Sequence, residues 1–136
     1  MTQSVFLLPS TLGRRFALLM LSLFFIVGGV NHFIQPQFYL NIMPPYLPWP
    51  MALIWISGVL EIAGGIGVLL HRFRSMSGVL LVLVIIAVTP ANIHMAMNPE
   101  LYPGIRVWLL YIRLPLQLLI IWWAWWATRL PQSTAS

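Results

Sequence analysis

The chain has no cysteine, no lysine and no aspartate, and charge of either sign is scarce. Without cysteine it cannot contain a disulfide framework, a thiolate metal site or a dithiol relay of its own. Only 7% of its 136 residues are charged, whereas soluble domains carry about 25%. Hydrophobic residues make up 60% of the chain, and the mean hydropathy is +0.91. This composition predicts an integral membrane protein of a single domain.

The acidic residues are only Glu61 and Glu100, so the sequence offers no carboxylate pair for general acid–base catalysis. It also lacks a nucleophile elbow and a phosphate-binding loop, so we find no catalytic motif. His32 and His94 are not spaced as metal ligands on one helix, and we expect no metal site. The net charge of +5 comes from arginines that mostly flank apolar stretches, so it does not indicate a nucleic-acid partner.

Four stretches have the length and apolar character of membrane-spanning helices, which need about 20 residues each. They are residues 16–33, 51–70, 75–97 and 105–128. The sequence therefore predicts an all-α fold, a four-helix bundle that lies in the lipid bilayer. Pro90 and Pro115 fall within the third and fourth stretches and should kink those helices.

The arginines predict the orientation of the bundle. With four spans, five arginines fall on one side of the membrane: Arg14, Arg15, Arg72, Arg74 and Arg129. Basic residues concentrate on the cytoplasmic side, so we expect both termini inside (N-in/C-in). Residues 1–15 and 129–136 would then be cytoplasmic, and 16–33 would be a retained helix rather than a cleaved signal. Tryptophans near both ends of the spans fit aromatic belts at the two interfaces.

The outer loop over residues 34–50 is rich in proline, with five of the eleven prolines of the chain. Phe38, Tyr39, Ile42 and Met43 are spaced to form one or two helical turns on the membrane surface. Two interpretations stay open: a rigid interfacial loop, or a lid over a cavity.

Glu61 is the only charged residue in the second span, and a carboxyl at bilayer depth costs about 2.5–3.5 kcal/mol. Residues three and four positions away lie on its helix face. Those positions hold Ser57, Gly58, Gly64 and Gly65. Because small residues let membrane helices approach closely, we expect Glu61 to face the interior of the bundle.

Arg113 is the predicted partner of Glu61, because it is the only basic residue deep inside another span. It shares a helix face with Arg106 and Gln117. Asn31, His32, Asn92 and His94 fall in the outer half of the membrane under the predicted topology. A candidate ligand-binding cluster follows: Asn31, His32, Glu61, Asn92, His94, Arg113 and Gln117. Such a cluster is either packing between helices or a site that binds or moves something.

Several runs of the sequence are similar to the DoxX-like family of small bacterial membrane proteins. They are GGVNHFIQP, PPYLPWP, SGVLEIAGGIGVLL, PANIHMA and the late element formed by Arg113, Leu114, Pro115, Leu116 and Gln117. The resemblance extends from about Phe16 to Trp126. It implies a four-helix bundle in the bacterial cytoplasmic (inner) membrane. It also implies an association with quinone-coupled redox or oxidative-stress processes, at most as a subunit of a quinone-linked oxidoreductase.

Three functions are compatible with the sequence. The protein could bind a quinone or a similar lipophile between its helices, under the 34–50 loop. It could instead be a non-enzymatic accessory subunit that docks on a membrane redox partner or forms a homo-oligomer. The third alternative is a proton-linked transporter, in which Glu61 serves as the relay.

Overall fold

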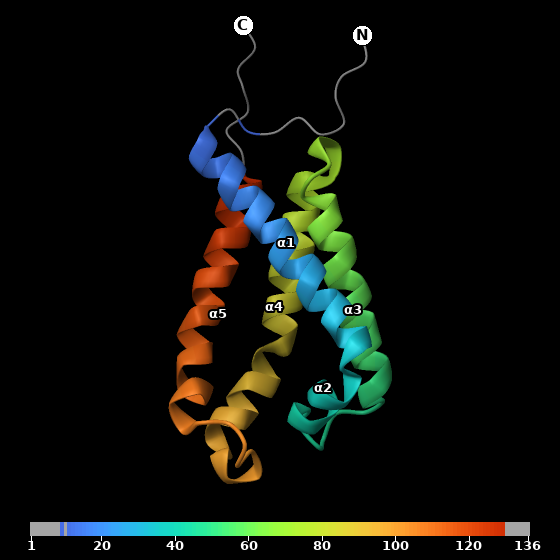
Figure 1. The fold of residues 1–136 in the computed structure, drawn as a ribbon, viewed down its shortest axis with the longest axis vertical. Coiled ribbons are helices and arrows are strands. Elements are labelled where there is room, and N and C mark those ends of the chain that lie inside the picture. Colours follow the sequence, from blue (N-terminus) through green and yellow to red (C-terminus); the bar gives the residue numbers. More distant parts are fainter. Residues whose placement is uncertain (1–8, 10, 130–136) are drawn as a thin grey trace, which may run out of the picture.

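The computed structural model describes residue 9 and residues 11–129, and this part of the chain is helical without any strand. Four long helices form the bundle: α1 (Leu12–Ile34), α3 (Pro50–Gly67), α4 (Arg74–Met97) and α5 (Val107–Thr128). Three short elements connect them: α2 (Pro36–Ile42), η1 (His71–Phe73) and η2 (Pro99–Leu101). Figure 1 shows that α2 and the α4–α5 connection lie at one end of the bundle, and the α3–α4 connection at the other.

The long helices are each sufficiently long and apolar to cross a membrane, which confirms the predicted all-helical bundle and indicates a multi-pass membrane protein. Their bounds differ from the predicted ones by a few residues. The first helix begins at Leu12 rather than residue 16. The second helix ends at Gly67 rather than residue 70. The chain turns there, and the buried Arg74 side chain donates a hydrogen bond to the Val68 carbonyl at 2.7 Å.

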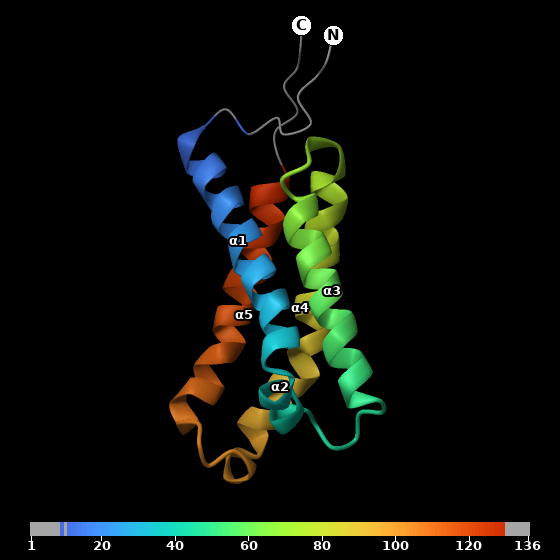
Figure 2. The same ribbon diagram turned by 45° about the vertical axis from the view of Figure 1, so that its right-hand side comes forward.

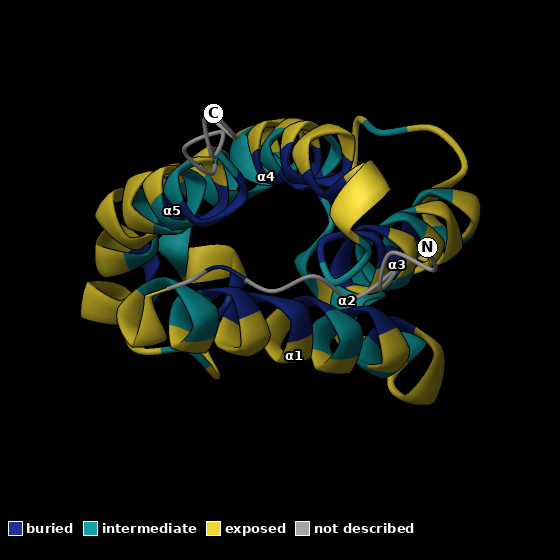
Figure 3. Ribbon diagram, turned by 90° about the horizontal axis from the view of Figure 1, so that it is seen from above, coloured by how far each residue is buried: buried dark blue, intermediate teal, exposed yellow. Residues whose placement is uncertain are grey.

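The four long helices surround a common centre in the order α1, α3, α4, α5, as seen from above in Figure 3. The most extensive contacts join α1 with α3 and α4 with α5, while α3 and α5 lie across the bundle from each other. The two pairs are visible as separate arms at the α2 end in Figure 1, and Figure 2 shows the same bundle from another side. A residue on α3 therefore meets α1 and α4 before it meets α5.

Glycines set the close approach of α1 and α3. A Cβ atom on Gly29 would lie 2.7 Å from the carbonyl oxygen of Gly58, and one on Gly58 would lie 3.0 Å from the carbonyl oxygen of Gly29. Two helical turns further along, the buried Ser22 hydroxyl donates to the Gly65 carbonyl at 2.6 Å. The small-residue stripe predicted around Glu61 thus packs on α1 through Gly58 and Gly65, while Gly64 packs on Leu81 of α4.

The hydrophobic core is densest near the α3–α4 connection. Its buried members come from α1, α4 and α5 and from Val68 directly after α3: Leu18, Leu21, Phe25, Val68, Leu81, Ile85, Ala124 and Ala127. Arginines close this end. Arg14 lies over the Trp126 ring and Arg129 over the Trp125 ring, at 4.9 and 4.2 Å from the ring centroids.

The sequence explained Arg74 by membrane topology, whereas the structure also gives its side chain a buried structural role. Its side chain is 2% exposed and donates to the carbonyls at the end of α3. The position of this end relative to the cytoplasm stays a prediction. Of the two segments expected to be cytoplasmic, residues 1–8, 10 and 130–136 lie outside the described residues.

Candidate functional site

Glu61 of α3 lies against His32 of α1, and not against Arg113 of α5 as the sequence predicted. His32 Nε2 and Glu61 Oε2 are 3.1 Å apart, and they form the only ion pair among the described residues. Arg113 instead donates to the sulfur of Met95 at 3.7 Å. The physical reason is the order of the helices, because α1 adjoins α3 whereas α5 lies across the bundle from it. Depth along the helices was a poor guide to which helices are neighbours.

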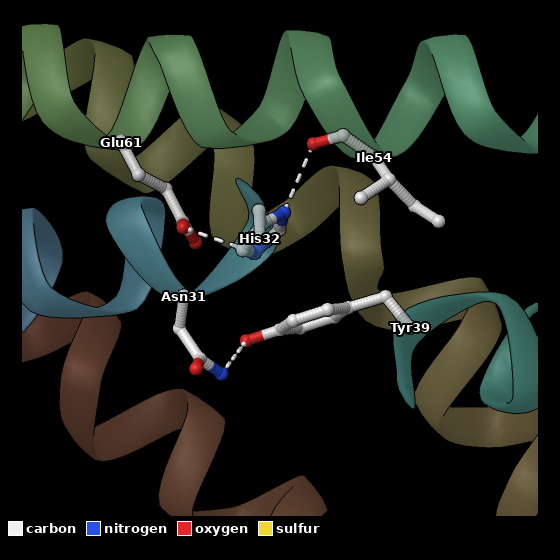
Figure 4. A network of polar contacts seen from close by, with 5 residues as sticks. All are labelled: Asn31, His32, Tyr39, Ile54 and Glu61. Carbon is white, nitrogen blue, oxygen red and sulfur yellow. Dashed lines mark hydrogen bonds and ion pairs between the residues drawn. The ribbon is translucent and has the colours of Figure 1, made fainter. Parts of the chain in front are cut away.

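The contacts of the His32 ring, drawn in Figure 4, define its tautomer. Its Nδ1 lies 3.0 Å from the carbonyl oxygen of Ile54, which can only accept a hydrogen bond. Nδ1 therefore carries a proton. If Nε2 were then an unprotonated lone pair, it would face an anionic carboxylate oxygen. Because that arrangement is repulsive, one proton must be shared between Nε2 and Glu61, as either an imidazolium–carboxylate or an imidazole–carboxylic acid pair.

The pair is largely enclosed, with side-chain exposures of 10% for His32 and 16% for Glu61. At 3.1 Å, Nε2 and Oε2 are close enough to share this proton, and Oε2 makes no hydrogen bond to any other described residue. Oε2 itself is buried. The pair is therefore enclosed in a medium of low dielectric constant, where a charge on either side chain without a compensating partner is costly.

Tyr39 of α2 covers the other side of His32. The two rings stack with centroids 4.0 Å apart and an interplanar angle of 28°. The Tyr39 hydroxyl accepts a hydrogen bond from the Asn31 side-chain amide at 2.9 Å, so both residues belong to one network (Figure 4). Helix α2 confirms the short helix predicted in the outer loop. Its role is to place an aromatic ring over the ion pair, and the sequence prediction did not include Tyr39 in the site.

Asn92 and Gln117 come together in a second group, between α4 and α5. The Asn92 amide donates to Gln117 Oε1 at 3.0 Å. Gln117 Nε2 in turn donates to the Ile85 carbonyl and to the Thr89 hydroxyl, both at 2.6 Å. Gln117 is 7% exposed, so these bonds satisfy a buried amide beside the helix that Pro90 interrupts. The sequence prediction missed Thr89. Its position one helical turn before Asn92 could have signalled that the two polar side chains share a helix face.

His94 forms a third group at the outer-loop end of α4. Tyr46 and Tyr102 meet its ring edge-on, with centroid distances of 5.8 and 6.4 Å. Asn98 donates through its side-chain amide to the His94 carbonyl at 2.9 Å, and the same nitrogen lies 3.4 Å from His94 Nδ1. Because an amide nitrogen can only donate, Nδ1 is the acceptor and Nε2 carries the proton. Nε2 is buried and has no hydrogen-bond partner among the described residues.

A cleft of about 420 Å³ opens beside His94. Its lining residues are Tyr46, Pro90, Ile93, His94, Met97 and Asn98. Burial raises the pKa of the neighbouring Tyr102 hydroxyl, and the nearby Tyr46 raises it further, so Tyr102 stays neutral at physiological pH. The cleft thus combines apolar walls with a few neutral polar groups, as small-molecule sites do.

A second cleft of about 450 Å³ lies along α4 and α5, one turn closer to the centre of the helices. It is lined by apolar side chains, and its polar members are Thr89 and Gln117. Both of these side chains already bond within the amide group described above. The second cleft therefore offers apolar contact with little free hydrogen-bonding capacity, and Ile93 is common to both clefts.

The predicted cluster is thus divided into separate groups rather than converging on one centre. Asn31, His32 and Glu61 are together, as are Asn92 and Gln117. His94 and Arg113 each have other neighbours. The sequence prediction also missed Tyr46, although it lies in the proline-rich loop that was considered as a lid. No group of three or more His, Cys, Asp or Glu residues that could hold a metal occurs in the described part of the chain.

The family described as Domain of unknown function (DUF8561) matches residues 21–128. This range includes all three polar groups and both clefts. No curated protein and no solved structure matches the chain.

Proposed function

The chain belongs to the DUF8561 family, and from the geometry of its clefts we propose that it binds a quinone or a similar carbonyl-bearing lipophile beside His94. The observation that carries this proposal is the buried Nε2–H of His94, which has no hydrogen-bond partner among the described residues. A buried donor without a partner costs about 1–3 kcal/mol. A carbonyl oxygen that enters the cleft would recover that cost.

The surroundings of His94 favour a flat apolar ligand. Ile93, Met97 and Tyr46 are all exposed on the protein surface, where a lipophile could enter from the bilayer. Small-molecule sites typically occupy about 300–1,000 Å³, and the cleft of about 420 Å³ falls in this range. The edge-on tyrosine rings would contact the faces or edges of a quinone ring.

The resemblance to the DoxX-like family supports a redox setting in the bacterial cytoplasmic membrane. In that setting the protein would hold the quinone beside a membrane redox partner. The sequence also allowed an accessory subunit that docks through its small-residue stripe. That surface is already occupied within the chain, because Gly58 and Gly65 pack on α1 and Gly64 packs on α4. Quinone binding therefore accounts for more of the geometry.

The test is a titration of the protein in nanodiscs with ubiquinone and menaquinone analogues, followed by quenching of tryptophan fluorescence. His94→Leu should weaken binding by at least about tenfold, which corresponds to 1.4 kcal/mol, the size expected for one hydrogen bond in a buried site. His71→Leu is the matched control, since His71 is exposed in the α3–α4 connection. Saturable binding that is equal in both variants would refute the role of His94, and a lack of saturation would refute the proposal.

A further inference from the structure

We propose that His32 and Glu61 form a proton-binding site with a single entrance, the Oε1 atom of Glu61. The proposal does not depend on the cleft at His94. It rests on the contacts of His32 with Ile54 and Tyr39 and on the burial of Glu61 Oε2, which together leave one route for a proton to enter and leave.

The imidazole of His32 is closed to exchange with anything except Glu61. Its Nδ1–H is occupied by the Ile54 carbonyl at 3.0 Å. Its Nε2 faces Glu61 Oε2 at 3.1 Å, and Tyr39 stacks on the ring face at a centroid distance of 4.0 Å. A proton on Nε2 can therefore pass only to the carboxyl group of Glu61 (Figure 4).

The carboxyl group has one closed and one open oxygen. Oε2 is fully buried and lies against His32. Oε1 is not among the buried unpaired atoms and makes no hydrogen bond to the described residues, so the 16% exposure of the Glu61 side chain includes this atom. Gly28 lies opposite, where even a Cβ atom would be 3.7 Å from Oε2. Gly28 is thus a neighbour of the closed oxygen, and Oε1 is the open one.

The site can alternate between two protonation states. In the first, the pair holds one shared proton and is neutral. In the second, a hydronium ion in water gives a proton to Oε1 and becomes water, and the pair becomes an imidazolium beside a neutral carboxylic acid with a charge of +1. Release reverses the step. Loss of the shared proton instead would leave an uncompensated negative charge inside the bundle, which is costly.

The other ionisable groups on the surrounding helices have contacts elsewhere and do not compensate the charge of the pair. Tyr39 of α2 stacks on His32 and is occupied by Asn31. Arg113 of α5 contacts Met95, and His94 of α4 contacts Tyr46 and Asn98. Within the described residues, the pair is the only site where a carboxyl group meets a titratable base at ion-pair distance.

The composition of the chain makes a direct test feasible. Because Glu61 and Glu100 are the only acidic residues, protein labelled with ¹³C at the glutamate side-chain carboxyl gives two carboxyl signals. Glu61→Gln assigns them, and Glu100 in η2 serves as the internal reference. ¹⁵N labelling of the three histidines reports the His32 tautomer, with assignment by His71→Gln and His94→Gln.

The full-length protein in nanodiscs would be titrated between about pH 4 and pH 9, a range that spans the ordinary Glu and His values. We expect the pair to take up one proton as the pH falls, seen in the Glu61 carboxyl signal or in the His32 Nε2 signal according to which atom holds the shared proton, while His32 keeps a protonated Nδ1 throughout. His94→Leu should leave this titration unchanged, so failure here is distinct from failure of quinone binding. A titration in which neither the Glu61 carboxyl signal nor the His32 Nε2 signal moves, or a His32 ring with an unprotonated Nδ1, would overturn the proposal.

Discussion

Replacement of Gly29 by alanine should separate α1 from α3 and lower the stability of the bundle. The new Cβ atom would lie 2.7 Å from both the Gly58 carbonyl oxygen and the Ile62 Cγ1 atom, and 3.0 Å from the Ile62 nitrogen. Two of these three atoms belong to the backbone, so no rotamer change can relieve the contact. The helices must move apart by about 0.7 Å to reach an ordinary contact of about 3.4 Å.

The cost can be estimated from this displacement. A gap of 0.5–1 Å forfeits about a quarter to a half of each dispersion contact across an interface. Overpacking of this kind typically costs about 1–3 kcal/mol. Alanine also gains about 0.5–1 kcal/mol over glycine inside a helix, which partly offsets the loss.

Gly28→Ala is the matched control, because it adds the same methyl group to the same helix one residue earlier. There the Cβ atom would meet nothing closer than the Glu61 carboxyl at 3.7 Å. The gain in helix propensity cancels between the two variants, so their difference isolates the steric cost of about 1–3 kcal/mol. Unfolding in mixed detergent micelles, followed by tryptophan fluorescence, measures that difference. Equal stability of the two variants would refute the close backbone contact between α1 and α3.

Three other outcomes follow from the described contacts. Gln117→Leu should cost about 1–3 kcal/mol of unfolding free energy, because it removes three hydrogen bonds and leaves the Asn92 amide donor without its acceptor; an unchanged unfolding curve would contradict the amide group. Arg74→Met should cost about 1.5–3 kcal/mol through loss of the bond to the α3 carbonyls, whereas Arg72→Met should change stability little, and thermal unfolding of both checks this. In the cysteine-free chain, a membrane-impermeant maleimide applied to whole cells should label Gly104→Cys and spare Gly13→Cys, and the opposite pattern would reverse the predicted orientation.

The helices of this protein could be predicted because long apolar stretches and flanking arginines are local signals. All four spans were found, and the short helix α2 followed from the spacing of apolar residues in the outer loop. The small-residue stripe around Glu61 also predicted correctly that this face packs inside the bundle. The error at the end of α3 arose where a side chain from the following helix intervenes, since Arg74 donates to the Val68 carbonyl.

The partners of the polar residues could not be predicted in the same way. Glu61 and Arg113 have compatible depths, but pairing also requires neighbouring helices, and the order of helices around the bundle is a tertiary property. His32 was recognised as polar and outer, yet its Nδ1 bond to the Ile54 carbonyl depends on the close glycine contact between α1 and α3. Tyr39 entered the site only because α2 folds back over α1.

The central claim, that a quinone-like lipophile binds beside His94, is tested most directly by photoaffinity labelling in nanodiscs. A photoreactive quinone analogue would be activated on the full-length protein, and the labelled peptides mapped by mass spectrometry. We predict label within residues 90–98, which include five of the six residues that line the cleft. An excess of unmodified quinone should displace this label. Label spread over the outer faces of all four helices, or label that excess quinone does not displace, would contradict the account.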